Sequence, residues 1–525
     1  MTTSSRIPEG IVATPPVIAM FELYGKGYLW LAVTTSLIGA FSTVLSGTIV
    51  NVAIPEIMGA YGISQTEAQW MSTGFLASGT VTMLLGAWFI QVFGMRSTYI
   101  GAMFVFLFGS ILGGVAPNPE VLVLSRIITG ACAGLIGPMA MILNFQIFPV
   151  KRRGLAMGLF GVGMVLAPGL GPAIGGMIIE NYDWRYVFFL GLPFSMVAIP
   201  LAVMFMPQKE EIDSHPPLDK VGIILLSIFL VTVLTGLSDG QKEGWESEYI
   251  VSLFGTAFIS GVSFIAWEIN IEFPMLNFRL FLNYRFLAAA VVTFAMGIGL
   301  YGSIFMVPLF LQTLQGIMPA DSGLLLAPAG LAMAVFFPIA GAMSDRIQPR
   351  MVIVAGLGLF AISNWLLREI NISTPYIQIM LCTVLGRIGL AFIFPSLNAA
   401  SLSALPLQQL TQGAGAINFL RQLGGAFGVN GLSIFMAQRS IEYSEQFAIT
   451  QVSRPATLQY LTEIQDKMFG QHFGFVRDFP APFAHLADGI FRQATAMAYR
   501  EAFVVVALIM VVSMVPALFI KIDRK

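Results

Sequence analysis

The 525-residue chain is dominated by apolar side chains: 56% of its residues are hydrophobic and only 10% are charged. A soluble domain carries roughly 25% charged residues, so this chain has too few charges to solvate a globule of its size. The net charge of −1 also leaves no cationic face for nucleic acid. Composition therefore excludes an ordinary soluble protein, a disordered chain and a nucleic-acid-binding protein, and it predicts an all-α protein that crosses a lipid bilayer many times.

Crossing the hydrocarbon core takes roughly 20 apolar residues in a helix, and the sequence contains fourteen stretches that meet this requirement. They lie at 28–52, 68–90, 98–116, 121–143, 155–180, 185–206, 219–239, 249–270, 286–315, 321–344, 351–370, 376–399, 413–438 and 499–521. The connections between them are short, except for a polar stretch at 439–498. The first apolar stretch continues past Val50 and lacks the cleavage signature of a signal peptide.

The Lys and Arg residues of the short connections fall mainly on one side of the predicted membrane. If the N-terminus is cytoplasmic, the inner side holds Arg96, Lys151, Arg152, Arg153, Lys209, Lys220, Arg279, Arg285, Arg346 and Arg350. The outer side then holds only Arg185, Lys242 and Arg368. Because cytoplasmic loops are enriched in Lys and Arg, both termini are predicted to be cytoplasmic, and 439–498 is predicted to be an outer, periplasmic loop.

Two predicted spans repeat one pattern, in which an intramembrane Arg is followed by Gly and Pro. The fourth span contains Arg126 and Pro138, and the twelfth contains Arg387 and Pro395. Such duplication is typical of secondary transporters built from repeats. It predicts a 6+2+6 arrangement, with two six-helix halves separated by an inserted pair. The predicted units are an N-terminal segment at 1–27, a first bundle at 28–206, two linker helices within 207–285, and a second bundle at 286–525.

The fifth span contains an unusual density of helix-bending and small residues, among them Pro168, Gly171, Pro172, Gly175 and Gly176. Proline removes a backbone donor and glycine removes side-chain bulk, so such a helix can bend and press closely against a neighbour. Plain helix packing is one interpretation of the pattern. The segment also resembles the antiporter motif of the major facilitator superfamily.

Further motifs resemble the same superfamily over about residues 40 to 520. Residues 45–55 resemble the first-helix motif of the fourteen-helix drug:proton antiporters, and 184–188 resemble the start of their sixth helix. Residues 421–428 are similar to their thirteenth-helix signature, and 341–346 to the cytoplasmic gating loop. The pattern is most similar to that of EmrB-like exporters. The resemblance implies a major facilitator fold of fourteen transmembrane helices that works by alternating access.

Two positions depart from the family pattern. The first gating loop has Gln91 where the superfamily usually has Asp, which leaves Asp345 and Arg346 as the better-preserved copy of the latch. The first-helix motif has Ser46 where the antiporter family usually carries an Asp, a candidate for proton coupling. A serine does not titrate near neutral pH, so the sequence leaves open how this chain couples transport to protons.

The ionisable residues predicted at mid-membrane depth are all cationic: Arg126, Arg387 and Arg421. An intramembrane charge is costly and is by default a functional candidate, although each Arg can instead be a structural tie to backbone carbonyls. Resemblance to the fourth-helix motif implies that Arg126 ties proton movement to conformation. A cavity that holds Arg residues without a facing carboxylate favours anionic or zwitterionic substrates.

Polar residues near these arginines complete the predicted site. Ser46, Thr48 and Asn51 are expected to face the substrate cavity as positioning groups, together with Arg387 and Arg421. Asp321, at the outer start of the tenth span, is the acid to test as a proton site. A helix N-cap is the alternative role for this aspartate.

The predicted function is secondary active export of drug-like or amphipathic small molecules across a bacterial inner membrane, driven by proton antiport. No phosphate-binding G-x-x-x-x-G-K-[ST] loop is present, so an ion gradient is expected as the energy source, and no metal or other cofactor is predicted. The alternatives are an uptake symporter for a metabolite and a lipid-modifying membrane enzyme. Resemblance implies a periplasmic adaptor (a membrane fusion protein) and an outer-membrane channel as partners, and a solvated lid without a partner is the alternative.

Overall fold

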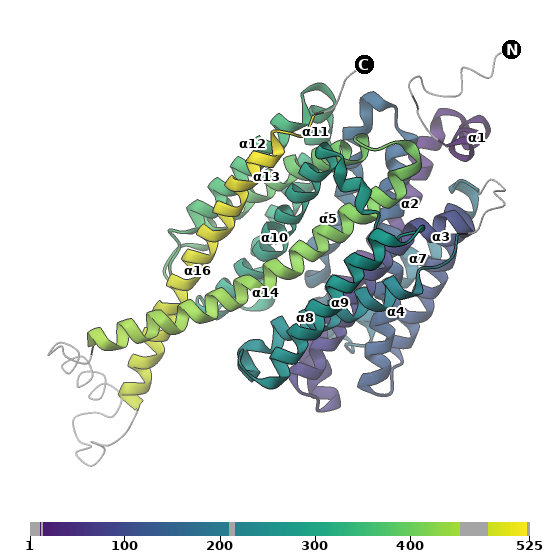
Figure 1. The fold of residues 1–525 in the computed structure, drawn as a ribbon. Helices are drawn as coiled ribbons and strands as arrows, with labels where there is room; N and C mark the ends of the chain where they lie inside the picture. The colour runs from purple at the N-terminus through teal and green to yellow at the C-terminus, as the bar shows by residue number, and fades with distance from the viewer. Residues whose placement is uncertain (1–10, 12–13, 209–215, 452–480, 522–525) are drawn as a thin grey trace, which may run out of the picture.

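The computed structural model describes residues 11, 14–208, 216–451 and 481–521, and the regular secondary structure within these ranges is entirely helical. The long helices run side by side along one direction in an elongated bundle (Figure 1). Helix α1 and the C-terminal end of α16 lie at the same end of this bundle (Figure 1). The all-helical prediction is confirmed for the part of the chain that is described.

The helices have the following bounds. They are α1 Pro15–Tyr24, η2 Gly25–Gly27, α2 Tyr28–Tyr61, α3 Gln65–Gly114, α4 Pro119–Ile147, η3 Val150–Arg152, α5 Arg153–Asn181, α6 Tyr186–Phe189, α7 Leu192–Phe205, α8 Lys220–Glu243, α9 Glu248–Asn270, η4 Phe278–Leu282, α10 Tyr284–Thr313, α11 Pro319–Arg346, α12 Pro349–Leu367, α13 Tyr376–Ser403, η5 Leu407–Gln409, α14 Leu410–Gln451 and α16 Ala481–Ala517.

Eleven stretches of the described residues are long and apolar enough to cross a bilayer as helices. Each of the fourteen predicted spans overlaps a helix, but two of them, 68–90 and 98–116, overlap the same 50-residue helix α3. Gly94 interrupts α3 with φ 80° and ψ 163°, a conformation that residues with a side chain rarely adopt. The glycine therefore divides α3 into two arms, one for each predicted span.

Helices extend into the predicted outer loop and into the predicted N-terminal segment. The predicted loop at 439–498 is partly helical, because α14 continues to Gln451 and α16 begins at Ala481. The apolar part of α14 ends before the helix does. Beyond it, Arg439 of α14 forms ion pairs with Glu442 at 2.6 Å and with Glu501 of α16 at 2.8 Å. The rest of that loop, 452–480, lies outside the described residues. The predicted N-terminal segment likewise contains α1.

The helices pack in two groups with a separate pair. Helix α3 packs along α4, and α2 packs against α5, α4 and α7. In the second group α13 packs against α12 and α11, and α14 packs against α10 and α16. Helices α8 and α9 pack mainly on each other. The principal contact between the two groups is made by α5 with α11, and a smaller one is made by α3 with α14.

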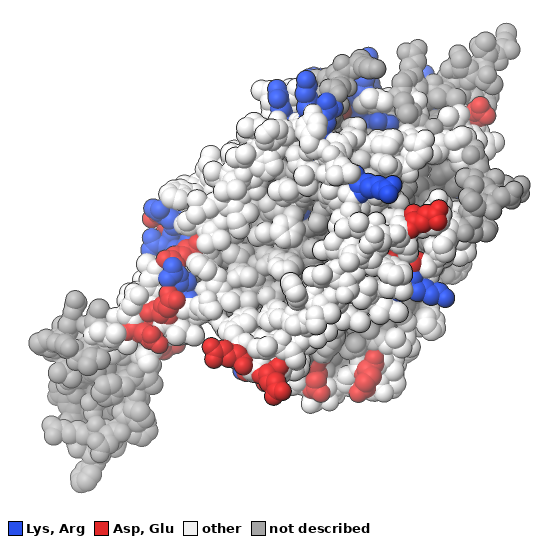
Figure 2. Space-filling model, in the orientation of Figure 1, with Lys and Arg blue, Asp and Glu red and all other residues white. Residues whose placement is uncertain are grey.

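Charged side chains are distributed unequally along the bundle. Lys and Arg gather at the end where α11 and α12 meet, while Asp and Glu lie along the lower edge of the same face, with Lys and Arg among the acids at the left (Figure 2). A broad area without charged side chains separates the two regions (Figure 2). An uncharged band between charged ends is the surface expected of a protein whose middle lies in lipid.

Candidate transport site

Glycines bring the backbones of α5 and α11 into contact near the N-terminus of α5. A Cβ atom added to Gly154 would lie 2.3 Å from the carbonyl oxygen of Gly341, and one added to Gly341 would lie 2.3 Å from the carbonyl oxygen of Gly154. One helical turn further on, a Cβ on Gly158 would lie 2.5 Å from the carbonyl oxygen of Phe337. Because these positions have no side chain, the two helices approach more closely than any other residue type would allow.

The carboxylate of Asp345 closes the same contact. Its Oδ1 accepts a hydrogen bond from the backbone N–H of Gly154 at 2.7 Å, and its Oδ2 accepts one from Leu155 at 3.0 Å. The first N–H groups of a helix have no partner within the helix and carry partial positive charge. Asp345, in the last turn of α11, therefore satisfies the N-terminus of α5. Arg346 ends α11 and is exposed.

The first gating loop makes no equivalent contact. Gln91 is exposed, and its side chain forms no hydrogen bond in the described part of the structure. The backbones of α3 and α14 instead approach each other closely at Gly415, where an added Cβ would lie 2.7 Å from the carbonyl oxygen of Met83. Gln422 of α14 also donates to the carbonyl oxygen of Leu76 at 3.4 Å. A carboxylate cap is therefore observed between α5 and α11, and none is observed at Gln91.

The other residues of the fifth-span motif lie further along α5, which remains helical through both prolines. Pro168 is half-buried. A Cβ on Gly171 would lie 2.7 Å from Oγ1 of Thr48, and a Cβ on Gly175 would lie 2.7 Å from the side chain of Ile49, so this half of α5 packs on α2. Open space surrounds Gly176, and the side chain of Pro172 lies outside the described residues.

Arg126 is fully enclosed where α2, α3 and α4 meet, with 1% of its surface exposed. Its Nη1 donates to the carbonyl oxygen of Ser46 at 3.1 Å and to the Ser46 hydroxyl at 3.4 Å, and its Nε donates to the carbonyl oxygen of Met71 at 3.4 Å. The guanidinium lies 4.3 Å from the ring centroid of Phe75. Its Nη2 has no hydrogen-bond partner. The residue that replaces the family's acid, Ser46, is thus the direct neighbour of this arginine.

The two remaining mid-membrane arginines belong to the second helix group. Arg421 is buried, donates to the side-chain oxygen of Asn418, and lies 4.8 Å from the ring centroid of Phe394. Arg387 is half-buried on α13. The Nη1 atom of each of these two arginines is enclosed and has no hydrogen-bond partner. Three arginines of the predicted site therefore each have one enclosed nitrogen without a hydrogen-bond partner.

The smaller polar residues of the predicted site are placed as follows. The Thr48 hydroxyl donates to the carbonyl oxygens of Val44 at 3.3 Å and Leu45 at 3.2 Å, and the residue faces Gly171 of α5. The side chain of Asn51 lies outside the described residues. Asp321 is exposed in the first turn of α11. The N-cap of α11 is Met318, so the alternative role of Asp321 as that cap is wrong.

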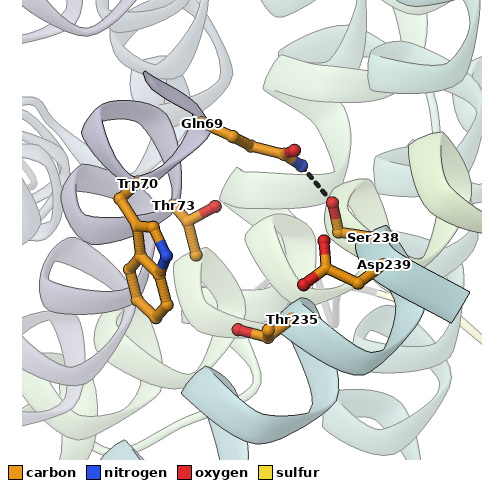
Figure 3. Close-up of a pocket in the computed structure, with 6 residues that line it drawn as sticks. All are labelled: Gln69, Trp70, Thr73, Thr235, Ser238 and Asp239. Carbon is orange, nitrogen blue, oxygen red and sulfur yellow. Dashed lines mark hydrogen bonds between the residues drawn. The ribbon is translucent and has the colours of Figure 1, made fainter. Parts of the chain in front are cut away.

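A small hollow opens between α3 and α8 (Figure 3). Gln69 donates a hydrogen bond across it to Ser238, and Trp70, Thr73, Thr235 and Asp239 complete its lining (Figure 3). Its volume of about 10 Å³ is close to the minimum for one water molecule. None of the residues predicted to line a substrate cavity borders this hollow.

Sequence reasoning missed one buried pair of acids, Asp219 and Glu268, which are 5% and 2% exposed. Both lie at the ends of predicted spans, where carboxylates are ordinarily solvated, so their position along the chain gave no sign of burial. A usable signal was the apolar sequence around Glu268, which follows Trp267 and precedes a second apolar segment.

Long apolar helices in two packed groups, with buried arginines and a tight seam between the groups, define a multi-pass membrane protein built for transport. The chain belongs to the Major Facilitator Superfamily, whose family model matches residues 36–429. Its relatives in this family are transporters and not enzymes.

Two relatives and one solved structure illustrate the similarity. The multidrug export protein EmrB of Haemophilus influenzae is 28% identical over 416 residues, which cover 79% of this chain and 81% of EmrB. The fatty acid resistance protein FarB of Neisseria gonorrhoeae is 29% identical over 428 residues, covering 81% and 84%. The proton:xylose symporter XylE shares the fold at 13% identity with a TM-score of 0.57, covering 92% of this chain and 95% of XylE.

Proposed function

We propose that this transporter is an exporter of amphipathic small molecules in a bacterial inner membrane. Relatives named for multidrug export and fatty acid resistance, each about as long as this chain, support export. We further propose that fourteen helices cross the membrane as 6+2+6, with α8 and α9 as the inserted pair and both termini in the cytoplasm. The gathering of Lys and Arg at the end that holds α1 supports this orientation (Figure 2).

The contact that carries this proposal is the capping of α5 by Asp345. It joins residues 190 and 191 positions apart, one in each proposed half, at the proposed cytoplasmic end. Close glycine contacts between α5 and α11 lie within 154–161 on α5 and 337–341 on α11, whereas Gly171 and Gly175 approach α2. A seam whose closest glycine contacts lie at one end supports alternating access, in which this contact breaks to admit substrate from the cytoplasm.

The proposed substrate class is anionic or zwitterionic amphiphiles. Arg126, Arg387 and Arg421 each retain an enclosed nitrogen without a hydrogen-bond partner. A buried donor without a partner is costly, and a carboxylate or phosphate satisfies it with a charge-assisted bond. The relative named for fatty acid resistance supports this class, because fatty acids are anions near neutral pH.

We propose proton antiport as the source of energy, with Arg126 as the residue that links protonation to conformation. Its hydrogen bonds to Ser46 and Met71 tie α4 to α2 and α3, so a change at Arg126 reaches three helices. A periplasmic adaptor that docks on the segment between α14 and α16 is also proposed, on the similarity to EmrB.

Inside-out membrane vesicles test the proposal directly. Labelled anionic, zwitterionic, neutral and cationic amphiphiles of matched size are offered to vesicles with and without an imposed pH gradient, for wild type and Arg126→Ala. We expect gradient-dependent uptake of the anionic compounds and its loss in Arg126→Ala. Uptake that does not depend on the pH gradient contradicts proton antiport. A strict preference for lipophilic cations contradicts the proposed class of anionic or zwitterionic substrates.

A further inference from the structure

Two carboxyl groups meet where α8 begins and α9 ends. Asp219 caps α8, and its Oδ1 accepts hydrogen bonds from the backbone N–H of Gly222 and from the indole N–H of Trp267, both at 2.8 Å. Glu268 lies in the last turn of α9, and its Oε2 accepts a hydrogen bond from the backbone N–H of Leu276 at 3.2 Å. Both side chains are more than nine-tenths buried.

The second oxygen of each carboxyl group points into a common space. Oδ2 of Asp219 and Oε1 of Glu268 are enclosed and have no hydrogen-bond partner. Both lie over Gly222: a Cβ on that glycine would be 2.2 Å from Oδ2 and 2.8 Å from Oε1. The two oxygens are therefore separated by no more than the sum of those distances, and the absent side chain of Gly222 provides the room for them.

No described cation neutralises the pair. Lys220 and Arg279, the nearest cations along the chain, are exposed, as is Glu272. Arg96 of α3, which packs on α8, donates to the carbonyl oxygen of Met206 at 2.8 Å. Arg421 of α14, which also packs on α8, is bound to Asn418. None of these groups forms an ion pair or hydrogen bond with Asp219 or Glu268 within the described residues.

We propose that Asp219 and Glu268 form a proton-binding site that holds one proton between Oδ2 and Oε1. Two buried carboxylates at this separation repel each other, whereas a single shared proton makes one oxygen a donor and the other an acceptor. The proton then satisfies both orphaned atoms at once. The site goes beyond the proposed export function, because neither acid belongs to the seam between α5 and α11 or to the arginines described above.

The position of the site gives the proton a structural role. Asp219 starts α8, Glu268 ends α9, and Leu276 belongs to the segment that leads to α10. The next residue, Asn277, donates to Oε1 of Gln412 on α14 at 3.3 Å. The shared proton therefore ties the α8–α9 pair to the second helix group, and its loss at high pH sets two negative charges against each other and loosens that tie.

The site lies at the end of α8 that we propose to be cytoplasmic, so it responds to cytoplasmic pH. Its stabilising effect has a definite sign. The folded pair retains a proton that free carboxylic acids release at about pH 4 to 5. The folded state therefore binds more protons than the unfolded state above this range, and its stability falls as pH rises until the pair itself ionises.

Glu268→Gln separates this proposal from its alternatives. The glutamine amide donates permanently to Asp219, so it mimics the protonated pair and keeps the fold. Purified wild type and variants are compared by infrared spectroscopy for the C=O stretch of a protonated carboxylic acid, and by melting temperature from acid to alkaline pH. Glu272→Gln, an exposed change a few residues away, is the matched control.

We expect the carboxylic acid band to disappear in Glu268→Gln and in Asp219→Asn, and to persist in Glu272→Gln. We also expect the melting temperature of wild type to fall relative to Glu268→Gln as pH rises, while Glu272→Gln follows wild type. An unchanged band in both pair variants overturns the proposal. The proposal is also overturned if the wild type lacks the band and added Mg²⁺ or Ca²⁺ raises the melting temperature of the wild type alone. That result would assign the site to a cation. Neither readout depends on substrate transport.

Discussion

The carboxylate of Asp345 accepts a hydrogen bond from the backbone N–H of Gly154, so the last turn of α11 caps the first turn of α5. The gating-loop aspartate thus bonds with the end of a helix. This arrangement uses the partial positive charge that every helix N-terminus carries. It also depends on glycine, because Gly154 and Gly341 allow the two backbones to meet at this point.

Removing the Asp345 carboxylate opens the seam between α5 and α11. In Asp345→Ala two N–H groups of α5 lose their acceptor, and we expect the closed state to weaken by about 1–2 kcal/mol, or roughly tenfold in population. A Leu155→Cys reporter, with Cys132 and Cys382 replaced by serine, then reacts about tenfold faster with a membrane-impermeant maleimide. Asp183→Asn, an exposed acid just beyond the other end of α5, leaves the rate unchanged. Equal labelling of Asp345→Ala and the unsubstituted reporter rules out the capping role.

Adding one methyl group at Gly158 separates the helices. The new Cβ meets the backbone carbonyl oxygen of Phe337 at 2.5 Å, and a backbone atom cannot move aside as a flexible side chain does. We expect Gly158→Ala to reduce transport at least tenfold. Gly176→Ala introduces the same methyl group into the same helix in open space and retains nearly full transport. Similar rates for the two variants show that the α5–α11 contact is dispensable.

Truncating Arg126 removes the tie between three helices. Arg126→Ala leaves the carbonyl oxygens of Ser46 and Met71 without their donor, and we expect transport to fall about a hundredfold while the protein still inserts and folds. Arg126→Lys restores the charge but not the fork of donors, so it recovers only part of the activity. Transport rate is measured together with melting temperature. Wild-type transport by Arg126→Ala contradicts the coupling role.

Restoring an acid at position 46 makes transport sensitive to pH. The Ser46 hydroxyl lies 3.4 Å from Nη1 of Arg126, so the carboxylate of Ser46→Asp forms an ion pair with that arginine. Protonation at low pH breaks the pair, and we expect the pH profile of the transport rate in this variant to contain an additional transition that the wild-type profile lacks. Ser46→Asn, of the same shape without the charge, follows wild type. Identical pH profiles for the Asp and Asn variants contradict the expectation.

Helix positions were largely predictable because apolar length alone identifies a membrane helix. The two spans predicted at 68–90 and 98–116 correspond to the two arms of α3, because the non-helical Gly94 divides that helix. The failures have physical causes. Helices α14 and α16 extend beyond their apolar parts, where the Arg439–Glu501 ion pair joins them, and an apolar-length criterion does not detect a helix stabilised by charges.

The candidate site was predictable by residue but not by partner. The position of Arg126 within an apolar span singled out that residue, and resemblance singled out Ser46 and Asp345. The hydrogen bond between Arg126 and Ser46 spans 80 positions and the capping of α5 spans 190, and local sequence carries no information on such distant pairs. The Asp219–Glu268 pair was missed for the same reason, since its burial comes from the packing of α8 on α9.

The central claim is that the contact between α5 and α11 opens and closes during transport. Spin labels at Lys151→Cys and Arg350→Cys, two exposed positions beside this contact, report the distance across it by pulsed electron paramagnetic resonance in a cysteine-free protein. The account predicts two populations: one with the separation seen in the structure, and a longer one that grows in Asp345→Ala and changes with substrate. A single distance that is unaltered by Asp345→Ala and by every transported substrate would contradict it.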